Sequence, residues 1–249
     1  MKKVLVIFGF LLTFAFGFSQ INPNEKLVYA ASYNMSGLLT HIAQVTMQTE
    51  IINTSKKSYL HLSWEGATFS KWDSFFKIRD LYESYVDPST LKPSLYKRSI
   101  SEGGYTKTEK YIFSGQKVNS VTRKKNGQEI KGVFNIGSSS QDIISMIYKL
   151  RTIDLGSMRS GQFKAFIIVF DQKEYPVWVK MLGHETVSAG NLGKKDCFKL
   201  SISAKTDKLK GVDKNLIWLT ADTKKVPVMV RFSIPVGTGQ MTLSSATGI

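Results

Sequence analysis

The sequence predicts a mainly β fold, with antiparallel curved sheets or an open β-barrel or half-barrel and one amphipathic helix packed against it. Three observations lead to this class. Short segments rich in Tyr, Val, Ile, Thr and Phe follow one another along most of the 249 residues. Turn-forming residues separate these segments at short intervals. In one central stretch, apolar residues instead recur at helical spacing.

Eight strands are predicted in the first half of the chain. The segment from Tyr59 to Trp64 alternates apolar and polar side chains, which is typical of a strand with one covered face. We expect a type I′ hairpin turn at Asn126-Gly127, because both residues tolerate positive φ. The pattern predicts an antiparallel meander with strands at 27–34, 42–52, 58–64, 81–87, 95–100, 105–113, 117–123 and 129–134.

The predicted helix covers about residues 139–151. Ser139 followed three residues later by Asp142 resembles a capping box, and Lys149 and Arg151 stand where the helix dipole favours cations. A second, shorter helical turn is expected at residues 71–76. The apolar residues that recur at helical spacing are Ile143, Ile144, Ile147 and Leu150.

The β pattern resumes after Gly156, and no internal repeat interrupts it. We therefore predict a single β-rich domain over residues 20–249, with two packed β subdomains that divide near residue 156 as the alternative. The central helix argues against an outer-membrane barrel. The strands expected in this half are 162–170, 175–188, 196–205, 215–221, 226–234 and 239–244.

The N-terminus predicts export. Lys2 and Lys3 precede an apolar run over residues 4–18, which is the pattern of a secretory signal peptide, and we expect cleavage after Ser19. The run is shorter than the ~20 residues that span a bilayer. The single cysteine is Cys197, so no lipoprotein anchor is expected at the cleavage point. The predicted location is the periplasm or the cell surface, in soluble form after residues 1–19 are removed.

The chain is basic, with 34 Lys and Arg against 19 Asp and Glu and a net charge of +15. In an exported protein this charge favours an anionic envelope polymer or lipid as partner, and we expect no nucleic acid. If the predicted turns meet at one end of the sheet, their lysines form a positive rim. The alternative is that these lysines keep the turns soluble and protect edge strands. The pairs are Lys56-Lys57, Lys124-Lys125, Lys194-Lys195 and Lys224-Lys225.

No catalytic or metal-binding motif stands out, and we expect no metal and no cofactor. The three histidines lack metal-ligand spacing, and Ser-x-x-Lys matches occur at the frequency expected by chance. Alternation places Cys197 on the side of Lys199, which predicts a partly buried thiol with a structural role. The acids that could form a catalytic carboxylate pair are Asp73, Asp80, Glu83, Asp87, Glu102 and Glu185.

Aromatic residues are concentrated between residues 68 and 85. Most of these rings are expected in the core, and the others are candidates for lining an apolar pocket. They are Phe69, Trp72, Phe75, Phe76, Tyr82 and Tyr85.

Several phrases together resemble the bacterial exported proteins of the domain-of-unknown-function 3108 family. They lie at 25–29, 75–87, 102–105, 142–151 and 216–228, spread in order over the chain. The resemblance implies a β-dominated fold, akin to the half-barrels around a helix of periplasmic lipoprotein carriers, and it implies no established activity. It draws attention to Asp80, Glu102, Tyr148, Arg151 and Asp222.

These observations favour a non-catalytic envelope protein that binds an apolar or amphiphilic ligand, or a partner, on a concave β surface beside the helix. Lysines would meet an anionic head group. One alternative is a structural or assembly module of envelope complexes, and another is a polysaccharide hydrolase that uses two carboxylates. The candidate ligand-binding residues are Trp72, Phe75, Phe76, Tyr148 and Arg151.

Overall fold

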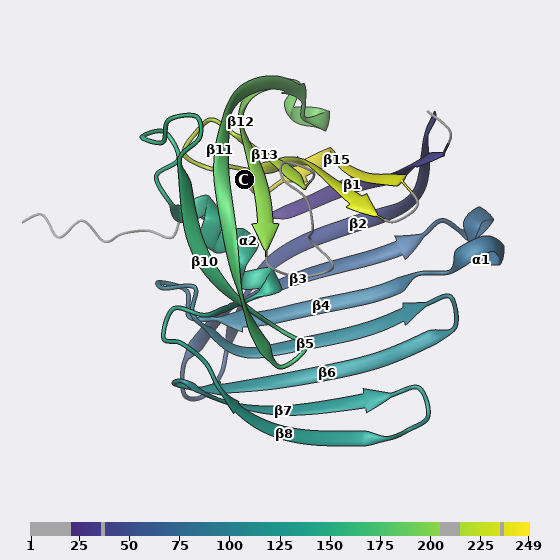
Figure 1. Ribbon diagram of the computed structural model, residues 1–249, viewed down its shortest axis with the longest axis vertical. Coiled ribbons are helices and arrows are strands. Elements are labelled where there is room, and N and C mark those ends of the chain that lie inside the picture. Colours follow the sequence, from purple (N-terminus) through teal and green to yellow (C-terminus); the bar gives the residue numbers. More distant parts are fainter. Residues whose placement is uncertain (1–20, 36–37, 205–214, 235–236) are drawn as a thin grey trace, which may run out of the picture.

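The computed structural model describes residues 21–35, 38–204, 215–234 and 237–249 (Figure 1). The predicted signal peptide, residues 1–19, lies outside these ranges. All described strands belong to one 15-stranded sheet with the order β8-β7-β6-β5-β4-β3-β2-β1-β15-β14-β13-β12-β11-β10-β9. The sheet is curved and open, without closure into a barrel, so the predicted fold class is confirmed.

The first half of the sheet is an antiparallel meander, as the alternation predicts. Each of the eight predicted segments overlaps an observed strand, and the short helix α1 (Ser70–Phe76) connects β3 to β4 where a helical turn was expected. The strands are β1 (Lys26–Met35), β2 (Leu38–Asn53), β3 (Ser58–Thr68), β4 (Arg79–Val86), β5 (Pro93–Glu102), β6 (Tyr105–Ser114), β7 (Lys117–Lys124) and β8 (Glu129–Asn135).

The second half follows helix α2 (Ile143–Thr152) and returns to the first. β15 pairs with β1 along its length, so the two halves form one continuous sheet. The predicted segments again overlap the strands. Only the two-residue parallel strand β9 (Gln141–Asp142) has no counterpart in the prediction. The other elements are β10 (Phe163–Phe170), β11 (Lys173–Ser188), the 3₁₀ turn η1 (Gly190–Leu192), β12 (Lys194–Ala204), β13 (Leu216–Thr220), β14 (Pro227–Ile234) and β15 (Gly237–Thr247).

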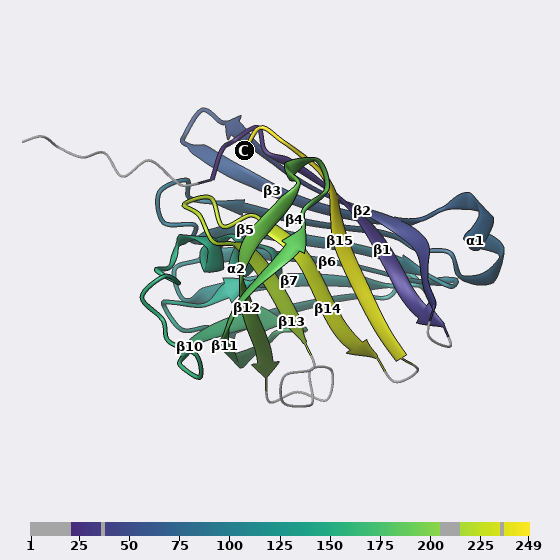
Figure 2. The ribbon, with the colours of Figure 1, turned by 90° about the horizontal axis from the view of Figure 1, so that it is seen from above.

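Helix α2 lies between the two halves of the curved sheet (Figure 2). Ile144 and Tyr148 are one turn apart and pack into the larger apolar cluster, which includes β1 to β5. Met146 and Leu150 are likewise one turn apart and pack against β11, β12 and β13. The helix therefore lies on the concave side of the sheet and makes apolar contacts with both halves of it.

The N-terminus of α2 differs from the prediction. Asp142, not Ser139, caps the helix, because its carboxylate accepts hydrogen bonds from the backbone N–H groups of Ile144 (2.9 Å) and Ser145 (2.8 Å). Gln141 and Asp142 pair with β10, which keeps the backbone extended up to the cap. The helix thus begins at Ile143, and the predicted start at residue 139 is wrong.

The turn between β7 and β8 also differs from the prediction. Gly127 has φ 77°, but Asn126 does not have positive φ, and the N–H of Gly127 donates to the carbonyl of Lys124 (2.9 Å). The predicted type I′ turn is therefore wrong. The hydrogen bond makes Gly127 the last residue of a turn that begins at Lys124, and not one of its two central residues. Two successive positive φ values occur instead at Gly103 and Gly104, between β5 and β6, and at Asp171 and Gln172, between β10 and β11.

Candidate functional site

The register of β1 to β8 shows which side chains share the concave face, since directly paired residues point to the same side of a sheet. One row runs from the apolar core into charged residues: Leu27, Met47, Trp64, Tyr82, Arg98, Glu109 and Thr122. The next row toward α1 contains Val45, Gly66, Asp80, Ile100, Lys107 and Lys124. The row on the other side contains Thr49, Leu62, Ser84, Tyr96, Tyr111 and Ser120.

The row remote from α1 is covered by other parts of the chain. Ser84 donates a hydrogen bond to the carboxylate of Asp142 (2.6 Å), and the N–H of Gln172 donates to the hydroxyl of Tyr111 (3.1 Å). Figure 1 shows the hairpin of β10 and β11 crossing over the meander, while the ends of its strands near α1 extend beyond this hairpin. We call the residues Trp64, Gly66, Asp80, Tyr82 and Ile100 the α1-side concave surface.

Two aromatic rings form the apolar part of this surface. Trp64 and Tyr82 are half-buried and meet edge to face, with ring centroids 5.1 Å apart. The indole lies against Gly66, where a Cβ atom would come within 3.2 Å of the ring. Burial raises the pKa of Tyr82 to about 12, so its phenol is neutral and can donate a hydrogen bond.

A buried ionic cluster bounds this surface. Arg98 contacts Glu109 and Asp171 (2.7 Å), and Lys107 contacts the same two carboxylates at 2.7 Å and 3.0 Å. The guanidinium of Arg98 lies 4.4 Å from the ring centroid of Phe170. Two cations and two carboxylates balance each other, so the cluster attaches the β10 to β11 turn to β5 and β6 without a net local charge.

Asp80 and Glu102, both identified from the sequence, meet in the structure. The Asp80 side chain is 5% exposed, accepts a hydrogen bond from the N–H of Ser101 (3.0 Å) and is hydrogen-bonded to the carboxyl group of Glu102. Burial, supported by this second acid, raises the pKa of Asp80 to about 7. The two carboxyl groups therefore share a proton at acidic pH.

This pair does not have the geometry of a glycoside hydrolase, whose two carboxyl groups stand at least ~5 Å apart with room for substrate between them. Glu83 contacts His61 (3.0 Å) and Lys97 (3.6 Å). The other predicted acids also have structural partners: Asp73 pairs with Arg79, Glu185 pairs with Lys199, and Asp87 caps its own turn. The contacts of these described acids therefore indicate structural roles.

The shared proton predicts a pH-dependent stability. Asp80 binds its proton more tightly in the folded chain, with a pKa of about 7, than in the unfolded chain, near 3.8. Its stabilising contribution is complete below pH 3.8 and is lost as the pH rises through about 7. Relative to Asp80→Asn, the wild type should lose on the order of 3 kcal/mol of unfolding free energy between these values, since each pKa unit is worth about 1.4 kcal/mol. Urea unfolding at several pH values measures the difference, and parallel curves for the two proteins would contradict the assignment.

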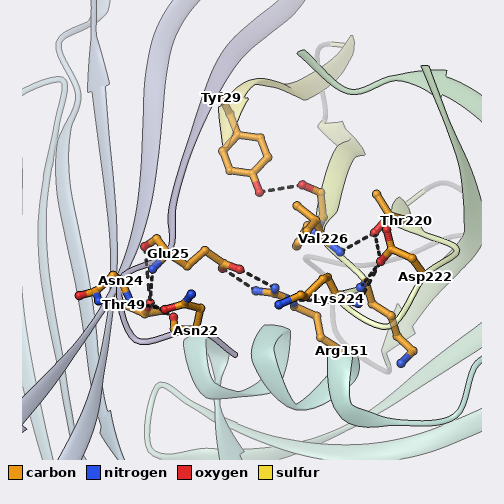
Figure 3. A network of polar contacts seen from close by, with 12 residues as sticks. Asn22, Asn24, Glu25, Tyr29, Thr49, Arg151, Thr220, Asp222, Lys224 and Val226 are labelled. Carbon is orange, nitrogen blue, oxygen red and sulfur yellow. Dashed lines mark hydrogen bonds and ion pairs between the residues drawn. The ribbon is translucent and has the colours of Figure 1, made fainter. Parts of the chain in front are cut away.

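Arg151 lies in the core, where it contacts Glu25 and Lys224 (Figure 3). The Arg151 guanidinium is fully buried, donates to both carboxylate oxygens of Glu25 at 2.6 Å and donates to the carbonyl of Lys224 at 3.2 Å. Tyr148 is also fully buried. Asp222 holds the turn after β13 by accepting hydrogen bonds from the Thr220 hydroxyl and two backbone N–H groups. Arg151 and Tyr148 therefore organise the core and leave no surface for a ligand, while the exposed Asp222 stabilises a turn.

The other predicted ligand-binding residues lie on α1. The indole of Trp72 donates to the carbonyl of His41 (3.0 Å), while Phe75 is 80% exposed and Phe76 is 47% exposed. The structure therefore divides the five predicted residues between the core and α1, and it does not bring them into one site. Sequence reasoning missed Trp64 and Gly66, although the alternation from Tyr59 to Trp64 already placed Trp64 on a strand.

The predicted lysine pairs are spread over different connections. Lys56 and Lys57 lie in the turn between β2 and β3, at the end remote from α1. Lys124 and Lys125 lie where β7 turns into β8, at the α1 end, and Lys194 and Lys195 begin β12. They do not form one continuous rim.

Cys197 is fully buried, so the predicted partial exposure is wrong. Both faces of β12 are covered: Cys197 packs in the larger apolar cluster, while Phe198 and Leu200 pack in the cluster beneath α2. Burial raises the pKa of the thiol to about 11. Among the described residues, no group of three His, Cys, Asp or Glu side chains could hold a metal ion, and no described helix is long and apolar enough to cross a bilayer.

The open curved sheet places the protein in the class of β-barrel-like proteins. A β-barrel-like protein of domain of unknown function DUF1849 from Brucella abortus has a TM-score of 0.57 with 10% identity, over 91% of this chain and 98% of that chain. The chain belongs to the family "Protein of unknown function (DUF3108)", whose sequence profile matches residues 28–244. The resemblance found in the sequence is thereby confirmed.

A more distant match is a protein from Parabacteroides distasonis that is provisionally named a lipoprotein. It has a TM-score of 0.36 and 9% identity, over 92% of this chain and 97% of that chain. No curated protein matches the chain. At 10% identity the match to the Brucella abortus protein shows the fold alone.

Proposed function

We propose that this protein is an exported, non-catalytic binding module of the bacterial cell envelope, which holds an apolar or amphiphilic molecule on the α1-side concave surface. The observation that carries the proposal is the half-buried pair of Trp64 and Tyr82 on a concave face. The N-terminal sequence pattern supports export. The pairing of the described acids favours binding over catalysis.

The surface suits an amphiphile because it joins apolar and polar groups. An acyl chain laid along the ring of Trp64 and the side chain of Ile100 would bury ~200 Å² of apolar area, worth about 5 kcal/mol before the cost of ordering the ligand. The neutral phenol of Tyr82 offers a hydrogen-bond donor. Lys124, which pairs with Lys107 in the same row, offers a cation to an anionic head group.

Native mass spectrometry of protein purified from its own envelope tests this proposal. We expect an adduct of lipid mass on the wild type and at least a tenfold lower occupancy on Trp64→Ser, because a tenfold loss corresponds to about 1.4 kcal/mol. Phe163→Ser is the matched control, since Phe163 is 62% exposed and begins β10. An unliganded wild type, or equal loss in both variants, would contradict the proposal. A stoichiometric protein partner without bound lipid would instead favour an assembly role.

A further inference from the structure

The sheet end at α1 exposes an unusual amount of apolar surface. Phe75 is 80% exposed, and Leu38, at the start of β2, is 75% exposed. Figures 1 and 2 show α1 and the end shared by β1 and β2 on the same side of the molecule. We call this region the α1 edge surface, with apolar residues Leu38, Leu39, Phe69, Phe75, Phe76 and Tyr105 and cations Lys71, Lys77 and Lys125.

The backbone under these side chains is held firmly. The N–H of Phe69 donates to the carbonyl of Ile42 (3.0 Å), and the Trp72 indole donates to His41. Asp73 accepts from the Thr68 hydroxyl and from Arg79, both at 2.6 Å. No residue of α1 is buried, so this helix does not contribute a core face of its own. Its rings are therefore presented to the outside by a fixed scaffold.

Exposed lysines flank the rings of α1. Lys71 and Lys77 are exposed at the two ends of α1, and no ion pair to either lysine occurs in the described part of the chain. Asp73, the acid within the helix, is neutralised by Arg79, and this contact keeps the pKa of Asp73 below its usual range. The Nζ atom of Lys125 lies beside Gly104, in the neighbouring turn between β5 and β6.

We propose that the α1 edge surface docks the protein onto an anionic lipid bilayer. Exposed Phe and Leu side chains flanked by lysines are the composition of an interfacial membrane contact: the rings enter the boundary between head groups and acyl chains, and the ammonium groups meet lipid phosphates. Figure 1 shows α1 projecting beyond the ends of the strands, so a flat surface can reach these rings. The α1-side concave surface then opens close to the bilayer.

Vesicle flotation tests the docking with protein purified after export, whose N-terminus is checked by mass spectrometry so that residues 4–18 do not contribute. We expect binding to vesicles of equal parts phosphatidylglycerol and phosphatidylethanolamine, and at least tenfold weaker binding to phosphatidylcholine vesicles. Raising the salt from about 0.1 M to about 0.5 M should weaken the binding, because the shorter Debye length screens the lysines.

Matched variants locate the contact. The double variant Phe75→Ser, Phe76→Ser and the double variant Lys71→Glu, Lys77→Glu should each lower the partition coefficient at least tenfold. Phe163→Ser, and Lys56→Glu combined with Lys57→Glu at the remote end, should leave it unchanged. Absence of binding to the anionic vesicles, or equal losses in the test and control variants, would overturn the proposal. Trp64→Ser should retain docking, which separates this test from that of the bound amphiphile.

Discussion

Replacing Glu25 with alanine should lower the free energy of unfolding by about 3–5 kcal/mol, which is a large share of the stability of a typical domain. The carboxylate of Glu25 is the buried partner of the Arg151 guanidinium, and both side chains are almost completely shielded from solvent. Without Glu25, a cation would remain buried, with a hydrogen bond to the carbonyl of Lys224. Urea unfolding followed by tryptophan fluorescence measures the loss.

Two further variants test whether burial causes this loss. Glu129→Ala removes an ion pair of similar length with Arg123 (2.7 Å), but Arg123 is 68% exposed, and we expect a cost below about 1 kcal/mol. The double variant Glu25→Leu, Arg151→Met removes both charges and should recover most of the stability lost in Glu25→Ala. If Glu25→Ala costs no more than Glu129→Ala, the buried ion pair does not make the predicted contribution to the free energy of unfolding.

Replacing Asp142 with alanine should cost about 2–4 kcal/mol. The substitution removes the N-cap of α2, worth ~0.5–2 kcal/mol, and leaves the buried hydroxyl of Ser84 without its acceptor, at ~1–3 kcal/mol. Because α2 packs against both halves of the sheet, loss of its first turn should also loosen the contact between them. Chemical denaturation gives the energy, and amide exchange at Ile144 and Ser145 locates the loosening.

Asp142→Asn should cost less than Asp142→Ala. Burial raises the pKa of Asp142, so the fully buried site disfavours the charged form, and a neutral amide still offers an oxygen to the helix N–H groups. Asp154→Ala is the control, because Asp154 accepts a backbone hydrogen bond from Ser157 (3.3 Å) near the surface. We expect its cost to be below about 1 kcal/mol, and a cost equal to that of Asp142→Ala would contradict the role of the cap.

Local patterns predicted the elements of this fold well. Alternation and turn residues located the strands because a strand buries the side chains of one face. The spacing of apolar residues located α2 because a helix likewise buries its apolar side chains. The start of α2 was misplaced because Gln141 and Asp142 pair with β10, a contact that no local pattern contains.

The candidate sites depended on contacts between distant residues. Glu25 and Arg151 are 126 positions apart, and only the curvature of the sheet brings them together. Asp80 and Glu102 were each identified, but the isolated bridge between Ile78 and Glu102 decides that they meet. Trp64 was predicted on a strand. Whether its ring is covered or accessible on the concave face depends on how far the second half of the sheet extends over it, which no local pattern contains.

The pairing of β1 with β15 has a consequence for how the chain folds. Lys26 lies opposite Thr247, so β1 gains its second neighbour only after every other described strand has emerged. Contacts of such long sequence separation slow folding, because the loop entropy must be overcome before the pairing is formed. Until the chain is complete, β1 therefore has an open edge, and premature association at that edge is the hazard against which this topology has to be protected.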